Sequence, residues 1–120
     1  MNQDILPAEL PGLAIQEALK RIEIPGEIFK TILVKFVENN KEKALAMLDA
    51  LARGDLPGLI MLAHTLKGAA ANIGAASLEQ NCLAVEMASK EGKGADELEG
   101  LINDLAQSLD VVVTSITNLS

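Results

Sequence analysis

The chain alternates between segments in which apolar residues recur every three or four positions and short breaks rich in polar residues or glycine. Apolar residues at this spacing fall on one face of a helix. The pattern predicts helices over residues 13–22, 27–53, 56–74, 77–90 and 96–116. Asn39-Asn40 interrupts the second stretch, so the pattern fits one kinked helix or two separate helices there. The Val111–Val113 run favours a strand locally, but the surrounding helical period predicts a helix.

Short breaks between amphipathic helices favour antiparallel neighbours. We therefore predict an all-α fold, an up-down-up-down four-helix bundle with an additional N-terminal helical segment covering one end. Residues 1–12 contain two prolines and little periodicity, and we expect a flexible lead-in there. Residues 13–120 then form one helical bundle domain. Only 2% of the residues are aromatic, which also favours packed helices over sheets.

The only histidine, His64, lies in the third predicted helix, which Asp55 can cap at its N-terminus. On a helical wheel the core-forming residues lie on the side opposite His64: Leu59, Leu62, Leu66, Ala70 and Ile73. The imidazole should therefore point away from the core.

Two neighbours of His64 suggest a chemical role. Gly68, one turn later, leaves free the surface directly over the ring, although glycine costs a helix about 1 kcal/mol relative to alanine. Lys67 is the only charged residue between Leu56 and Ala75. A nucleophile, a cation and a vacant position together fit a site that receives a phosphoryl group.

The pattern Ala63-His64-x-Leu66-Lys67-Gly68, followed by Gly74 and Leu78, resembles the histidine-containing phosphotransfer (HPt) family. The Leu10-Pro11-Gly12-Leu13 opening is similar to the start of such domains at the C-terminal end of hybrid sensor histidine kinases. The resemblance covers residues from Leu10 to the C-terminus.

The resemblance implies a phosphorelay intermediate in two-component signalling. His64 would accept a phosphoryl group from an aspartyl phosphate of a response-regulator receiver domain and pass it to another receiver aspartate. The receiver would supply Mg²⁺, so this domain would need no cofactor of its own. It would have no autonomous kinase activity, although it could be part of a hybrid kinase.

The resemblance also assigns supporting roles. Nε2 of His64 would be the nucleophile, Lys67 would offset the phosphoryl charge, and Gly68 would leave room for it. Glu86, on the next predicted helix, could orient the ring; its alternative interpretation is a solvated helix residue.

Three residues beside His64 lack the charge expected on an exposed helix face: Ile60, Met61 and Ala71. Small and apolar residues around a nucleophile let a partner approach closely and exclude water. We interpret them as a docking surface for a transient complex of an otherwise monomeric protein. For Ile60 and Met61, partial burial under the N-terminal segment is the alternative.

Composition and charge limit the partners, the location and the kinds of site that this protein can have. A net charge of −7 argues against nucleic acid and anionic membranes as partners, because phosphate groups are bound by clustered Lys and Arg. No segment suits membrane insertion or export, which indicates a cytoplasmic protein. Cys82 is the only cysteine and lies in an apolar stripe, so we expect a buried thiol and no internal disulfide. One histidine and one buried cysteine make no metal site.

Two other classes of protein are alternatives to the phosphorelay interpretation. A sensor-kinase dimerisation domain usually has an acidic residue after its histidine, where this chain has Thr65. The second alternative is a purely structural or docking bundle, in which His64 has no chemical role.

Overall fold

The computed structural model describes residues 10–15, 17, 20 and 25–119 of the chain. In this part of the chain lie the helices α2 (Gly26–Asn40), α3 (Lys43–Ala52), α4 (Leu56–Asn72), α5 (Ala76–Lys90) and α6 (Ala95–Thr117). The predicted all-α fold is confirmed. Apart from an isolated bridge between Leu10 and Leu13, the described residues form no β-structure. None of the described helices is long and apolar enough to cross a lipid bilayer.

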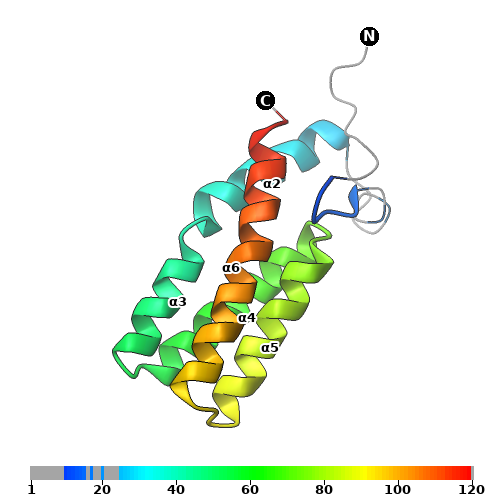
Figure 1. Ribbon diagram of the computed structural model, residues 1–120. Helices are drawn as coiled ribbons and strands as arrows, with labels where there is room; N and C mark the ends of the chain where they lie inside the picture. The colour runs from blue at the N-terminus through cyan, green and yellow to red at the C-terminus, as the bar shows by residue number, and fades with distance from the viewer. Residues whose placement is uncertain (1–9, 16, 18–19, 21–24, 120) are drawn as a thin grey trace.

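Helices α3, α4, α5 and α6 form an antiparallel four-helix bundle, in which each packs against the next and α6 packs against α3 (Figure 1). Helix α2 extends beyond the end of α3 and packs against α6. The stretch over 27–53 is therefore two helices, separated by a turn at Lys41-Glu42. The valine run of residues 111–113 lies inside α6.

The core lies along the bundle axis and consists mainly of aliphatic side chains. Apolar residues recur at helical spacing in the sequence of α2, at Ile28, Phe29, Ile32, Leu33 and Phe36. Three of them are buried, namely Phe29, Leu33 and Phe36. Ile28, expected in the same stripe, is 48% exposed. It lies about 100 degrees from Phe29 around the helix, at the edge of the stripe.

Both ends of α4 are fixed by local interactions. The carboxylate of Asp55 accepts a hydrogen bond from the Gly58 N–H (3.0 Å), the N-cap that the sequence predicts. After the helix, Gly74 has φ = +77°, a conformation that glycine adopts at little cost. These two ends set the length of α4 and its turn into α5.

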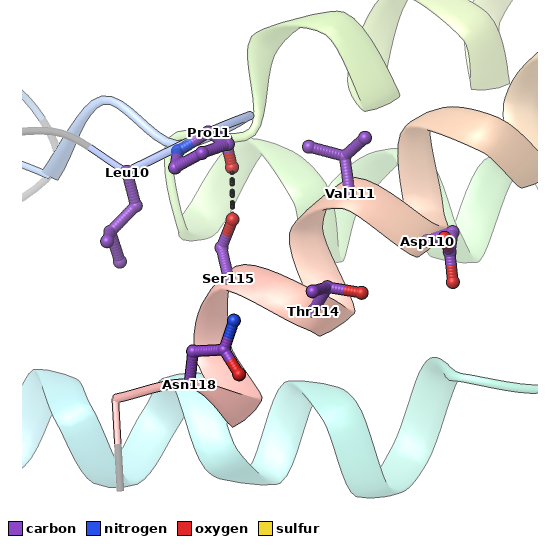
Figure 2. A pocket seen from close by; sticks show the side chains of 7 residues that line it. All are labelled: Leu10, Pro11, Asp110, Val111, Thr114, Ser115 and Asn118. Atoms are coloured by element: carbon purple, nitrogen blue, oxygen red, sulfur yellow. Dashed lines mark hydrogen bonds between the residues drawn. The ribbon is translucent and has the colours of Figure 1, made fainter.

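The end of the expected lead-in is described from Leu10. Residues 10–13 form a tight turn in which Gly12 has φ = +80°, and Ser115 of α6 donates a hydrogen bond to the Pro11 carbonyl (2.8 Å; Figure 2). The Ala14 N–H donates to the Gly74 carbonyl (3.0 Å). Residues 1–9, and half of the helix expected over 13–22, lie outside the described residues.

A pocket of about 370 Å³ opens between this turn and the C-terminal part of α6 (Figure 2). It is lined by Leu10, Pro11, Asp110, Val111, Thr114, Ser115 and Asn118. None of these residues belongs to α4, so the pocket is separate from His64.

Candidate functional site

His64 lies near the middle of α4, on the side of the helix away from the core. Leu59, Ala63, Leu66 and Ala70 of the same helix are buried in the bundle. The His64 side chain is 63% exposed. The helical wheel therefore places the ring correctly, on the surface of the bundle.

Glu86 of α5 reaches across to His64 and joins it to Lys67. One carboxylate oxygen, Oε2, lies 3.0 Å from His64 Nδ1, and the other, Oε1, accepts a hydrogen bond from Lys67 Nζ at 2.6 Å. The Glu86 side chain is only 5% exposed. The alternative of a solvated Glu86 is therefore wrong.

The contact with Glu86 determines which ring nitrogen of His64 is available. A carboxylate can only accept a hydrogen bond, so Nδ1 carries the proton and donates it. In the neutral form of the ring that makes this hydrogen bond, Nε2 carries the lone pair, and the His64 side chain is largely exposed.

The surface over the ring is open at Gly68. A Cβ atom built on Gly68 would meet no atom within 4 Å outside its own helix backbone. Packing among the described residues therefore gives no reason for a glycine at this position.

The three residues expected at a docking surface differ in exposure. Met61 is 65% exposed, whereas Ile60 and Ala71 are partly buried. Met87, which the sequence analysis did not select, follows Glu86 on α5 and is 50% exposed.

Comparison with models of protein families gives a match to the Hpt domain over residues 31–114, more than half of the chain. The chain belongs to the Hpt domain family. Hpt domains are phosphotransfer modules of two-component phosphorelays; they interact with receiver domains and are not kinases. Comparisons with curated proteins and with solved structures gave no match.

In this Hpt domain, Lys90 is a further member of the site that the sequence analysis missed. Its Nζ donates to Glu86 Oε2 at 3.1 Å, the oxygen that also faces His64. The spacing of four residues between Glu86 and Lys90 is a visible helical ion-pair signal. This spacing alone does not predict the role of Lys90, because it does not show that Glu86 is buried beside His64.

Hydrogen bonding holds the pKa of Glu86 at about 2, below its ordinary value of 4.5. The bond from Lys67 is the largest cause, while burial opposes it and the bonds from Lys90 and His64 add to the lowering. The Glu86 carboxylate of this Hpt domain therefore stays ionised over the whole physiological pH range.

Glu86 should make the stability of the Hpt domain depend on pH. Because the folded chain resists protonation of Glu86 down to about pH 2, this carboxylate stabilises the fold fully above pH 4.5. The contribution is lost as the pH falls from 4.5 towards 2. Urea unfolding at pH 6 and pH 3 should show that Glu86→Gln loses less stability than the wild type between the two pH values, by roughly 2 kcal/mol.

Glu99→Gln is the matched control, because Glu99 is exposed on α6. It should keep the wild-type difference between the two pH values. Equal losses in the wild type and in Glu86→Gln would contradict the assigned role of the ion pairs.

Cys82, on the same helix as Glu86, has a titratable thiol. It is fully buried, and burial is the main cause that raises its pKa to about 12. As predicted, it is a core residue. Within the described part of the Hpt domain, no group of three His, Cys, Asp or Glu side chains could hold a metal ion.

Proposed function

We propose that His64 is the phosphoacceptor of this Hpt domain, taking a phosphoryl group from a receiver aspartyl phosphate and passing it to another receiver aspartate. The observation that carries the proposal is the Nδ1 contact with Glu86 on a ring that is 63% exposed. It leaves the Nε2 lone pair available to a partner.

In the forward step, the Nε2 lone pair attacks phosphorus and an N–P bond forms. The P–O bond to the receiver aspartate breaks, and its electron pair returns to that carboxylate. The ring becomes a phosphorylated imidazolium, and Glu86 stabilises its positive charge through the Nδ1–H hydrogen bond. Transfer to a second receiver reverses these changes.

Such transfer depends mainly on positioning and on charge stabilisation. Lys67 offsets the charge of the phosphoryl group, and the open surface at Gly68 admits the group and the receiver. Ile60, Met61 and Ala71 contact the receiver around the acceptor. The receiver supplies the aspartate and Mg²⁺, and the domain acts as a cytoplasmic monomer without a cofactor of its own.

The test is to incubate the purified chain with each receiver domain encoded in the same genome, phosphorylated with a labelled phosphoryl group. We expect at least one receiver to transfer a label that is labile in acid and stable in base, as expected for an N–P bond. Phosphoramidate, a small phosphoryl donor, tests the acceptor independently of the partner. Absence of label from every donor would favour a structural or docking bundle.

A further inference from the structure

Lys90 is the more exposed of the two lysines that contact Glu86. Its side chain is 59% exposed, against 26% for Lys67, and both ammonium groups pair with a carboxylate that is 5% exposed. The two lysines use different oxygens: Lys67 contacts Oε1 and Lys90 contacts Oε2. With a neutral histidine, the cluster therefore has two positive charges and one negative charge.

One cation would suffice to neutralise the buried carboxylate. Leaving a buried charge without a partner is strongly unfavourable, so Glu86 needs at least one ammonium at all times. A phosphoryl group on Nε2 introduces further negative charge beside the ring. Lys67 is the only charged residue of α4, and it is already paired with Glu86.

The positive charge that the ring gains on phosphorylation is offset by the phosphoryl group that it carries. Lys67 therefore leaves Glu86 at the lowest cost when another cation stays behind. Lys90 meets this requirement. It lies one turn after Glu86 on α5 and contacts Oε2, whereas Lys67 contacts Oε1. Glu86 can then continue to accept the Nδ1–H of His64 while Lys67 moves.

We propose that Lys90 is a positioning residue, the permanent counterion of Glu86 that releases Lys67 to the phosphoryl group. The proposal rests on the proposed function of His64 and adds a residue to it. Lys90 acts through Glu86 and does not touch the phosphoryl group.

The first measurement is the rate of transfer from a phosphorylated receiver, together with the lifetime of the phosphorylated chain. Lys90→Met should lower the rate about tenfold, the loss expected for one charge-assisted hydrogen bond, and Lys90→Arg should restore it. Lys93→Met is the matched control, because it removes the same charge next to Glu91, at the end of α5. It should transfer like the wild type.

The decisive measurement repeats Lys90→Met in a Glu86→Gln background. A neutral amide at position 86 needs no counterion, so Lys90→Met should then have no further effect on the rate. An equal loss in both backgrounds would show that Lys90 acts directly on the phosphoryl group, and no loss in either would show that it is only a surface cation. Each result would overturn the proposal.

The two proposals fail in different ways. If the wild-type chain accepts no label, the function of His64 is wrong, and the role of Lys90 falls with it. If the wild type is labelled and Lys90→Met transfers at the wild-type rate, only the role of Lys90 is wrong.

Discussion

Replacing His64 with glutamine should abolish the acid-labile, base-stable label while leaving the fold intact. The chain has no other histidine, so no second imidazole can take over the role. The His64 side chain is 63% exposed, and a glutamine amide can still donate a hydrogen bond to Glu86. We therefore expect the free energy of unfolding to change by about 0.5 kcal/mol or less. Labelling with phosphoramidate and with a phosphorylated receiver measures the loss, and urea unfolding measures the stability.

The His64→Gln variant also tests whether a neighbouring residue is the phosphoacceptor. A phosphorylated lysine also contains an N–P bond, and Lys67 lies beside the same carboxylate as His64. Label that persists in His64→Gln with the same acid and base stability would therefore place the acceptor on a lysine. That outcome would contradict the assignment of His64.

Substitutions at Gly68 should have opposite effects on the stability of the fold and on the rate of phosphoryl transfer. Because a Cβ at this position meets open space, Gly68→Ala should stabilise the fold by about 1 kcal/mol through higher helix propensity. Gly68→Gln should also leave the fold stable, but its side chain would lie over the ring. We expect it to slow transfer from the receiver by about 100-fold, the size of effect that misplacing the reacting groups can have. Urea unfolding and transfer kinetics measure the two effects.

Gly100 provides the matched control for Gly68. It lies within α6, and a Cβ on it also meets nothing within 4 Å. Gly100→Ala should stabilise the fold by a similar amount, and Gly100→Gln should transfer at the wild-type rate. An unchanged rate in Gly68→Gln would remove the steric argument for this glycine.

The helices of the bundle could be predicted because their signals are local. The apolar period, the Asp55 cap and the glycine breaks together place α4 and α5 within a few residues of their observed ends. The sequence pattern does not decide between one kinked helix and two helices over 27–53, because the break depends on which side chains are buried there. Asn40 is buried there and donates to the Phe36 carbonyl, a contact that a sequence pattern does not reveal.

Features of the site that depend on one helix could be predicted from the sequence, whereas contacts between two helices could not. The exposure of His64 and the open surface at Gly68 follow from the position of each residue on one helix. The burial of Glu86 and its contacts with His64 and Lys67 depend on the register between α4 and α5, which the turn at Gly74 sets. Lys90 was missed because its meaning depends on that same register.

The division of the site between two helices has a consequence for any fragment of the domain. An α4 peptide alone would retain the imidazole but lose the acceptor that fixes its tautomer, since Glu86 belongs to α5. Local opening that separates α4 from α5 would have the same effect before the whole chain unfolds. The ability to hold Nε2 ready for attack is thus a property of the closed helix pair, and it can be lost while most of the helices remain.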